Sequence, residues 1–459
     1  MKKIKTNEKL KRKAYSNQTG ITLIALVVTI VVLLILAGVT INALFGDTGI
    51  INKAKDAQNK MDQAAENDLK AINGFNEWME ETANPHPSDK IKVKETGEKI
   101  GRDFQTDTVT AEDKNGNQVV VPGGFKISGD SGESVQQGIV IEDKDGNQFV
   151  WVPISNINGD GSNKIKKDDG NEVEITLGRY TFDGTYKLSS GKVEGTGAST
   201  LIQKGSEYEE VTIANVADGT VNTKYKAGDY YYELKESRVS NEKMDTTGTN
   251  TTAKNLKDFI EKTETNKGFY IARYEASYGS GYNAEGTDTA TKFGNAKPLS
   301  KPSTANSTDS MEYTIGTLWN FITQPQAALV SQNMYKNDSY VESDLVNSYA
   351  WDTAIVYIQT MKNENYANVN CNTIGNKSLM NTGSTGDEKC KIFDMAANSS
   401  EWTTEYSTNV RKTNSYTYPC TDRGGNYLYP LGFTSVRDGY FYATSSNNYF
   451  SFRTLLYVK

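Results

Sequence analysis

The feature that most constrains this chain is an uninterrupted uncharged run of 25 residues, from Ile21 to Phe45. As a helix the run would extend about 37 Å, and the hydrocarbon core of a bilayer is about 30 Å thick. The 20 residues ahead of it carry seven basic side chains and one acidic side chain. Because positive charge stays on the cytoplasmic side, we expect one membrane span with the bulk of the chain outside the cell.

An ordinary secretory signal has a cleavage site after its apolar core, whereas Gly20 offers a site before it. Cleavage there would remove the basic leader, keep the helix and change the net charge from −7 to −13. Such an acidic product makes nucleic acid an unexpected partner. An uncleaved signal anchor is the alternative, and both arrangements place the protein on a cell surface.

The junction Gly20-Ile21-Thr22-Leu23-Ile24 after a basic leader resembles the N-terminus of type IV pilins. The resemblance implies that a prepilin peptidase cuts after Gly20, that Ile21 becomes the methylated N-terminus, and that other pilins are potential partners. The family usually has glutamate at the fifth mature position, where this chain has Ala25. Membrane anchoring is therefore predicted more firmly than filament assembly.

Apolar residues recur at steps of mostly three or four from Ile50 to Met79, with charges between them. This spacing predicts an amphipathic helix over 46–83 that continues from the membrane segment at 21–45. The two prolines of Asn84–Ser88 end it and begin a linker over 84–110. Its apolar stripe could pack on the following domain or on the same helix of another subunit.

Two similar segments, EDKNGNQVVVPGGF and EDKDGNQFVWVPI, begin at Glu112 and Glu142. They lack the glycine and glutamate that an EF-hand loop needs at its sixth and twelfth positions, so they predict hairpins with turns at Asn115-Gly116 and Asp145-Gly146. We expect a β-hairpin region over 111–155, a polar insertion of strands and loops over 156–252, and the core of the outer domain over 253–459. A helix is predicted at about 253–263.

The residue counts limit the chemistry. His86 is the only histidine, which excludes Ser/His/Asp and Cys/His catalysis and multi-histidine metal sites. Cys371, Cys390 and Cys420 are too few for a disulfide scaffold, although one bridge is possible. No pair of carboxylates stands out as a glycan-cleaving pair, so an enzyme that uses only carboxylates is a minor alternative.

Five segments follow one another along the chain: FVWVPI at Phe149, GFYIARYEAS at Gly268, YAWDTAIVYI at Tyr349, IFDMAANSSEWTTE at Ile392, and RGGNY at Arg423 with a terminal FRTLLYV. In this order they resemble the formylglycine-generating enzymes, or sulfatase-modifying factor domains, over about residues 150–459. The resemblance implies an α+β chain in which the long N-terminal helix precedes a C-type-lectin-like domain.

Relatives that make formylglycine carry a copper-binding cysteine pair after the segment that matches RGGNY, and 426–459 contains no cysteine. Other relatives hold iron with histidines, and His86 lies outside the domain. The resemblance therefore implies a scaffold without enzymatic activity. It also implies one possible cofactor, a structural calcium ion, because hard oxygen ligands suit Ca²⁺. Its candidate ligands are Asp394, Ala397, Ser399 and Glu401.

The C-terminal segment is rich in Tyr, Asn, Ser, Asp and Gly, a composition typical of adaptable recognition surfaces. In some lectin-fold relatives this region is diversified by retroelements. We therefore predict a contact surface for an extracellular protein or glycan. Its candidate residues are Asn426, Tyr427, Tyr429, Arg437, Asp438, Tyr440, Tyr442, Asn447, Asn448 and Tyr449.

Two other groups are predicted to be internal. Trp151, Trp319, Trp351 and Trp402 lie within apolar segments and are expected in the core. Arg273, Glu275 and Arg423 are expected to be buried polar residues that stabilise the core through internal polar contacts. The sequence thus favours a membrane-anchored surface binding protein, with a minor pilin or pseudopilin subunit as the alternative.

Overall fold

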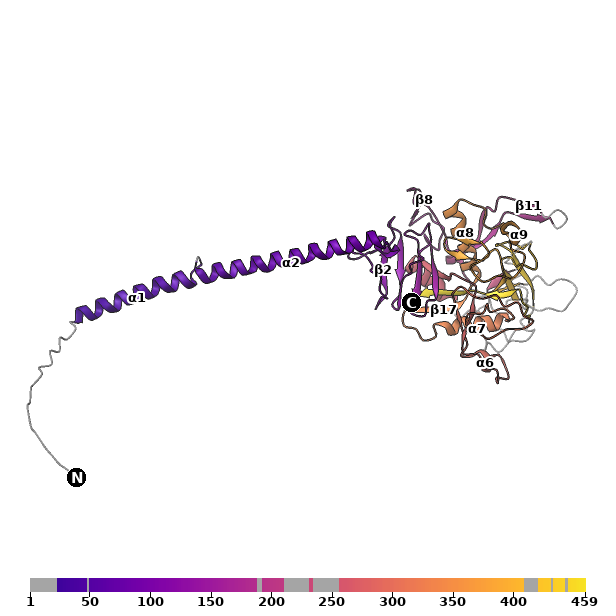
Figure 1. Cartoon of the computed structure of the whole chain (residues 1–459). Helices are drawn as coiled ribbons and strands as arrows, with labels where there is room; N and C mark the ends of the chain where they lie inside the picture. Colours follow the sequence, from indigo (N-terminus) through magenta and orange to yellow (C-terminus); the bar gives the residue numbers. More distant parts are fainter. Residues whose placement is uncertain are drawn as a thin grey trace, which may run out of the picture. The chain divides into compact units, whose positions relative to one another are not determined.

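The structure is a computed structural model of the whole chain (Figure 1). It describes residues 23–47, 49–187, 192–209, 231–233, 256–407, 420–430, 432–441 and 445–459. Gly20, Ile21 and Tyr442 lie outside the described residues. The chain divides into two compact units, an N-terminal unit over Met1–Asn84 and a C-terminal unit over Pro85–Lys459.

The described residues of the N-terminal unit form two helices, α1 (Leu23–Phe45) and α2 (Ile50–Ala83). Every described residue of α1 is uncharged, and one 18-residue window here is apolar enough to cross a membrane. The two helices meet at Gly46, whose amide donates to the Asn42 carbonyl. α2 ends one residue before Asn84-Pro85, as the prolines predict.

The main sheet of the C-terminal unit has six strands in the order β17-β24-β14-β6-β5-β4, all antiparallel. Long buried runs of β-branched and aromatic residues form its centre, where both faces are covered. The strands are β4 (Phe125–Ile127), β5 (Val140–Asp143), β6 (Gln148–Pro153), β14 (Gly268–Ala272), β17 (Val341–Leu345) and β24 (Thr454–Val458).

A second sheet has the order β13-β20-β21-β22, and β23 pairs with β20 in parallel. Its strands are β13 (Tyr231–Glu233), β20 (Ser400–Ser407), β21 (Cys420–Arg423), β22 (Arg437–Phe441) and β23 (Phe450–Phe452). A three-stranded sheet joins β1 (Lys92–Val93), β2 (Val109–Glu112) and β3 (Gln118–Val121). The chain is therefore α+β, as expected.

Three helices cover these sheets. α5 (Leu256–Asn266) packs on β14 and β24 through Leu256, Phe259 and Ile260, the face that the sequence predicts. α7 (Gln324–Met334) packs on β17 and β20, and α8 (Ser348–Lys362) packs on β6 and β20. The Asn347 side chain caps α8 by accepting a hydrogen bond from the Ala350 amide.

The remaining described elements are short. They are η1 (Pro87–Lys90), β7 (Ile165–Lys166), β8 (Glu172–Val173), β9 (Gly178–Phe182), β10 (Thr185–Lys187), β11 (Lys192–Glu194), β12 (Ser199–Lys204), η2 (Gly205–Glu207), β15 (Ser277–Ser280), α6 (Thr289–Phe293), β16 (Lys297–Leu299), α9 (Cys371–Ile374), β18 (Glu388–Lys389) and β19 (Ile392–Phe393).

Both predicted hairpins are present, β2–β3 and β5–β6. In each turn an aspartate, Asp113 or Asp143, accepts hydrogen bonds from the amides two and four residues later. Gly116 and Gly146 adopt positive φ values of 84° and 78°, which explains a glycine at both positions.

The predicted boundaries at 111, 156 and 253 fall inside the C-terminal unit. The physical reason is strand pairing: β6, which precedes the polar insertion, pairs with β14, which follows it. The described part of the insertion consists of short strands, and β9 lies against α8. Trp151, Trp319, Trp351 and Trp402 are fully buried, which confirms their place in the core.

Candidate functional site

The candidate site is built on the paired strands β21 and β22. Asp422 lies opposite Asp438, and Arg423 lies opposite Arg437. Successive side chains of a strand point to opposite faces, so the two aspartates share one face and the two arginines share the other. The repeat of an Asp-Arg and an Arg-Asp pair thus creates an acidic face and a basic face on the same two strands.

The Gly424-Gly425 pair turns the chain directly after β21. Gly424 has a φ of +81°, and a Cβ atom there would lie 2.5 Å from the Met395 carbonyl oxygen. A Cβ at Gly425 would lie 2.5 Å from the carbonyl oxygens of Ala396 and Gly432. Only glycine fits this turn, which sets the course of the segment that follows.

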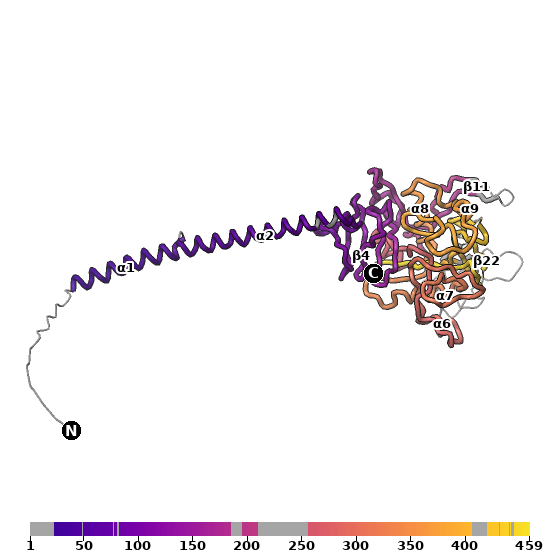
Figure 2. Tube along the Cα trace, in the orientation of Figure 1, coloured from indigo at the N-terminus to yellow at the C-terminus, as the bar shows by residue number. Residues whose placement is uncertain are grey.

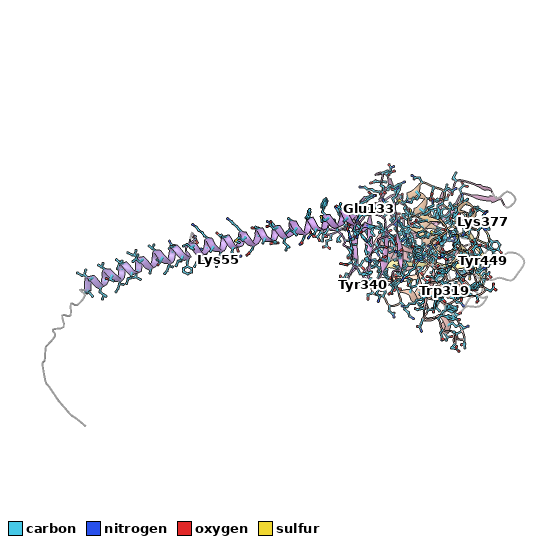
Figure 3. The ribbon with its side chains drawn as sticks, in the orientation of Figure 1. Lys55, Glu133, Trp319, Tyr340, Lys377 and Tyr449 are labelled. Atoms are coloured by element: carbon cyan, nitrogen blue, oxygen red, sulfur yellow. The ribbon has the colours of Figure 1, made fainter. Side chains whose placement is uncertain are left out.

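A cavity of about 240 Å³ opens on the acidic face of β21 and β22. We call it the C-terminal pocket. In Figure 2, β22 lies on the opposite side of the C-terminal unit from β4, and Figure 3 shows Tyr449 at the same end. The pocket is lined by Ser400, Asp422, Gly424, Asn426, Tyr429, Gly432, Val436, Asp438, Phe441, Tyr449 and Phe450.

Two carboxylates line the inner part of the pocket. Asp422 is 3% exposed, and its Oδ1 atom accepts no hydrogen bond from any described residue. Burial, followed by the nearby Asp438 carboxylate, raises the pKa of Asp422 well above its ordinary value, and a hydrogen bond with Ser400 acts in the opposite direction. Asp438 is half-buried beside it.

Aromatic rings form the walls. The ring centroids of Phe441 and Phe450 are 4.6 Å apart, those of Tyr449 and Phe450 also 4.6 Å, and those of Tyr429 and Tyr449 5.5 Å. Tyr429 is held in place because the Asn426 Oδ1 atom accepts a hydrogen bond of 2.7 Å from its amide. Its side chain is 59% exposed, so it forms part of the rim.

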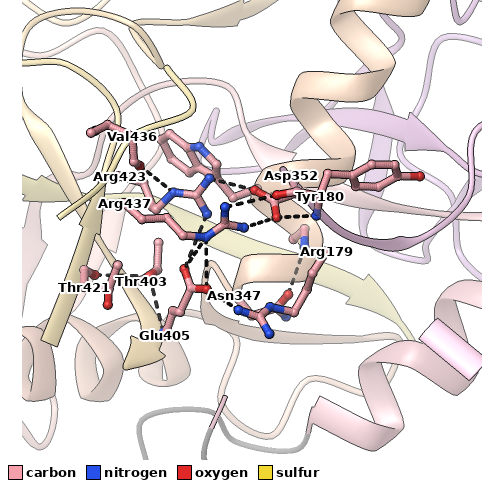
Figure 4. Close-up of polar contacts among 12 residues, drawn as sticks. Arg179, Tyr180, Asn347, Asp352, Thr403, Glu405, Thr421, Arg423, Val436 and Arg437 are labelled. Atoms are coloured by element: carbon pink, nitrogen blue, oxygen red, sulfur yellow. Dashed lines mark hydrogen bonds and ion pairs between the residues drawn. The ribbon is translucent and has the colours of Figure 1, made fainter. Parts of the chain in front are cut away.

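The basic face of the two strands packs into a buried ion-pair cluster (Figure 4). Arg423 lies 2.7 Å from Asp352 and 3.5 Å from Glu405, and Arg179 lies 2.8 Å from Glu405. Arg437 contacts Asp352 and lies 3.1 Å from Glu405. Although burial opposes ionisation, the three arginines hold the pKa of Glu405 below its usual value. The cluster fixes β21 and β22 to α8 and β20.

Of the ten predicted contact residues, the pocket brings together Asn426, Tyr429, Asp438 and Tyr449. Arg437 faces the interior, in the ion-pair cluster. Asn447 donates from Nδ2 to the Tyr449 hydroxyl, 3.0 Å away.

The other predicted contact residues lie around the pocket or outside the description. Tyr427 is half-buried, and the Asn448 carbonyl accepts a hydrogen bond from Asn320. The backbone of Tyr440 belongs to β22, but its side chain is outside the description, as is all of Tyr442.

Two of the four predicted calcium ligands, Glu401 and Asp394, have protein partners at their carboxylate oxygens. Both oxygens of Glu401 bind the Arg453 guanidinium, at 2.6 and 2.9 Å. Asp394 accepts hydrogen bonds from the Thr385 hydroxyl and the Gly383 amide. Ala397 and Ser399 are buried in the same turn. Within the described ranges no three His, Cys, Asp or Glu side chains are grouped to hold a metal ion, and calcium binding stays a prediction.

Other buried polar groups belong to the core. Glu275 accepts hydrogen bonds from Asn398 and from the Ser399 amide, while Arg273 lies 3.1 Å from Asp130. Both residues stabilise the core through internal polar contacts, as predicted, and each of them has its own partners. Cys371 and Cys390 are separate buried thiols, and burial raises the pKa of each to about 12. The possible disulfide is not formed between them.

Sequence reasoning missed Asp422, Ser400, Phe441 and Phe450 as pocket residues. The sequence does contain a pattern that could have predicted Asp422. Aspartate and arginine alternate in Asp422-Arg423 and Arg437-Asp438, and this places like charges on one face once the strands pair. Ser400 and Phe450 come from β20 and β23, whose parallel pairing no local pattern predicts.

Comparison with known proteins gave no match to a protein-family model, to a curated protein or to a solved structure.

Proposed function

We propose that the protein is a membrane-anchored cell-surface binding protein whose C-terminal pocket takes a group of an extracellular ligand. The observation that carries this proposal is the pocket itself, a cavity that polar and aromatic side chains of the Tyr- and Asn-rich segment line. Tyr429 at its rim combines a large contact area with few rotors, as recognition surfaces require. The apolar helix α1 supplies the anchor.

The proposal includes the origin of the two parts. The N-terminal junction at Gly20-Ile21 is processed by a prepilin peptidase, and the C-terminal unit is a non-enzymatic, C-type-lectin-like relative of the formylglycine-generating enzymes. The five ordered sequence segments support this assignment, and each contributes to the core of the C-terminal unit, through Trp151, Tyr270, Trp351, Trp402 and Leu456. The bulk of the chain is then extracellular.

The test compares substitutions at two adjacent residues, Leu428 and Tyr429. Full-length protein in detergent micelles is applied to a panel of immobilised glycans and surface proteins. We expect Tyr429→Ala to abolish the binding of the ligand that wild type retains, because its ring lines the pocket. Leu428→Ala is the matched control, since Leu428 is 49% exposed and does not line the pocket. Identical binding by wild type and Tyr429→Ala would contradict the proposal.

A minor pilin or pseudopilin subunit is a second candidate, and α2 favours it. Large apolar side chains of this helix are exposed along its length, including Met61, Leu69, Ile72 and Phe75. Such a stripe suits packing against the same helix of another subunit. Disulfide cross-linking in native membranes tests this helix packing. We expect a Leu69→Cys variant to cross-link more strongly than the control Asp68→Cys, which lies on the neighbouring face of α2. Equal cross-linking of both variants would count against helix packing.

A further inference from the structure

A second cavity, of about 690 Å³, lies in the C-terminal unit and shares no lining residue with the C-terminal pocket. Its walls come from β4, the turn between β5 and β6, the paired strands β15 and β16, and the loop after α7. We call it the lysine-lined cavity, because its lining includes Lys144, Lys297, Lys301 and Lys336. Segments that are distant in the sequence thus bring four ammonium groups to one place.

These four lysines have no partner among the described residues. All but the half-buried Lys301 are exposed, and none of the four forms an ion pair or donates a side-chain hydrogen bond within the described ranges. Lys126, which follows the lining residue Phe125, differs, because its Nζ atom lies 3.2 Å from the Glu142 carboxylate. The cavity therefore gathers like charges that a bound anion would compensate.

Three aspartates also line the cavity, and two of them bind its walls. The Asp143 carboxylate accepts hydrogen bonds from the Asp145 and Asn147 amides. It also accepts one from the Tyr335 hydroxyl, 2.6 Å away. Asp338 accepts hydrogen bonds from the amides two and three residues later. Asp145 is exposed and forms no ion pair with the four lysines of the cavity.

Hydrogen bonds fix the walls relative to one another. The Gln148 amide donates to the Ser300 carbonyl, 2.9 Å away, and the Ser300 amide donates to Asn147 Oδ1, 3.0 Å away. These bonds tie the end of β16 to the β5–β6 turn. The ring centroids of Tyr335 and Phe125 are 5.5 Å apart, which ties the loop after α7 to β4. The lysines are thus carried on walls that are in place before a ligand binds, and this lowers the entropic cost of binding.

The residue types indicate the class of anion. A lysine ammonium is a compact point charge with three donors, and it is a common phosphate ligand. Arginine, whose planar fork matches a carboxylate, is absent from the described lining. A phosphate group has more charge and more acceptor oxygens than a carboxylate, so it can contact more than one ammonium group.

The size and the apolar part of the lining indicate the rest of the ligand. The volume of about 690 Å³ lies within the ~300–1,000 Å³ usual for small-molecule sites, and it exceeds what one phosphate group would fill. Leu299, Ile315 and Met334 contribute apolar surface between the charged groups. This surface suits a carbon skeleton that joins separate anionic groups.

We propose that the lysine-lined cavity binds a small ligand that carries two phosphate groups on a carbon skeleton. The inference goes beyond the proposed function, since it adds a second site with a different class of ligand. Each phosphate group is held by ammonium groups from different walls, while the skeleton lies against the apolar side chains. The three aspartates keep the opposite charge from entering freely and favour ligands whose anionic groups are separated.

The experiment is isothermal calorimetry on the full-length protein in micelles of an uncharged detergent. The probes are glucose 1,6-bisphosphate, glucose 6-phosphate, and glucarate, a six-carbon dicarboxylate. We expect the bisphosphate to bind about tenfold or more tightly than either other probe. Its affinity should fall as the ionic strength rises from about 0.1 to about 1 M, because the Debye length shortens from about 10 to about 3 Å.

Two variants test the site itself. The double variant Lys297→Gln/Lys301→Gln should weaken bisphosphate binding about tenfold or more. Lys377→Gln is the matched control, because Lys377 is exposed and lies outside the cavity. A Cβ atom at the lining residue Gly123 would lie 2.6 Å from the Tyr340 ring, and Figure 3 shows Tyr340 and Lys377 on opposite sides of the C-terminal unit.

The outcomes separate this inference from the proposed function. Absence of bisphosphate binding, or equal binding by wild type and the double variant, would overturn the inference and leave ligand capture by Tyr429 intact. Equal or tighter binding of glucarate would overturn the choice of phosphate. Lys144→Gln/Lys336→Gln, at two exposed positions where folding does not depend on the side chain, should also weaken binding. Loss of bisphosphate binding in Tyr429→Ala would place the probe in the C-terminal pocket and contradict the assignment.

Discussion

The substitution Glu405→Gln tests the buried ion-pair cluster that supports the pocket. Glu405 is fully buried and contacts three arginines, Arg179, Arg423 and Arg437, at 2.8, 3.5 and 3.1 Å. Glutamine keeps the shape but removes the charge. Asp352 then remains as the carboxylate partner of Arg423 and Arg437, while Arg179 loses its ion pair with Glu405.

The expected loss follows from the asymmetry of buried ion pairs. Removing one member costs about 3–5 kcal/mol, because the other charge stays buried without compensation. We expect Glu405→Gln to lower the free energy of unfolding by this amount. The matched control is Glu261→Gln on α5, whose partner Lys257 is 3.7 Å away and 64% exposed; an exposed pair contributes less than about 1 kcal/mol.

The assay is denaturant unfolding followed by tryptophan fluorescence, since the buried Trp351 ring lies 5.6 Å from the Arg423 guanidinium of the cluster. A double-mutant cycle with Arg179→Gln adds a test of mechanism. The double variant should lose less stability than the sum of the single losses, because the second change removes one uncompensated charge. A loss below 1 kcal/mol for Glu405→Gln, or strict additivity in the cycle, would refute the reasoning.

Three further predictions concern other parts of the chain. Burial raises the pKa of Asp387 to about 7, so the folded state binds this proton more tightly than the unfolded state. The resulting contribution to stability, about 4 kcal/mol, is lost as the pH rises from about 4 to about 7. Asp387→Asn should therefore make the free energy of unfolding, measured across that range, less dependent on pH. Gly424→Ala should destabilise the protein by more than about 1 kcal/mol in thermal unfolding, because Gly424 has a positive φ and a Cβ atom there would clash with the Met395 carbonyl oxygen. The control Gly74→Ala on α2 should not destabilise the protein, because the space around Gly74 is open. Intact mass and N-terminal sequencing of the membrane protein should show a methylated start at Ile21, and a start at Met1 would indicate an uncleaved anchor.

Local patterns predicted much of the fold. The uncharged run gives α1, the three-to-four spacing gives α2, and two prolines end that helix at the predicted place. The hairpins are predicted because Asn-Gly and Asp-Gly turns are short-range signals, and the four buried tryptophans because they lie in apolar segments. These features depend only on neighbouring residues and on hydrophobic burial.

The binding surface was only partly predictable. Composition indicated the C-terminal segment, and the pocket contains four of its ten candidate residues. Composition could not separate Arg437, which faces the core, from Asp438, which lines the pocket, because that choice depends on which face of β22 is buried. Adjacent residues of one strand therefore have opposite roles.

The sequence by itself determined the apolar helix α1, the amphipathic helix α2 and the two hairpin turns, since each follows from local spacing. Only the tertiary structure decided that Asp422 meets Asp438, that three arginines share Glu405, and that Phe450 joins the pocket. The physical reason is that these contacts join strands distant in sequence, and their pairing register fixes which side chains share a face.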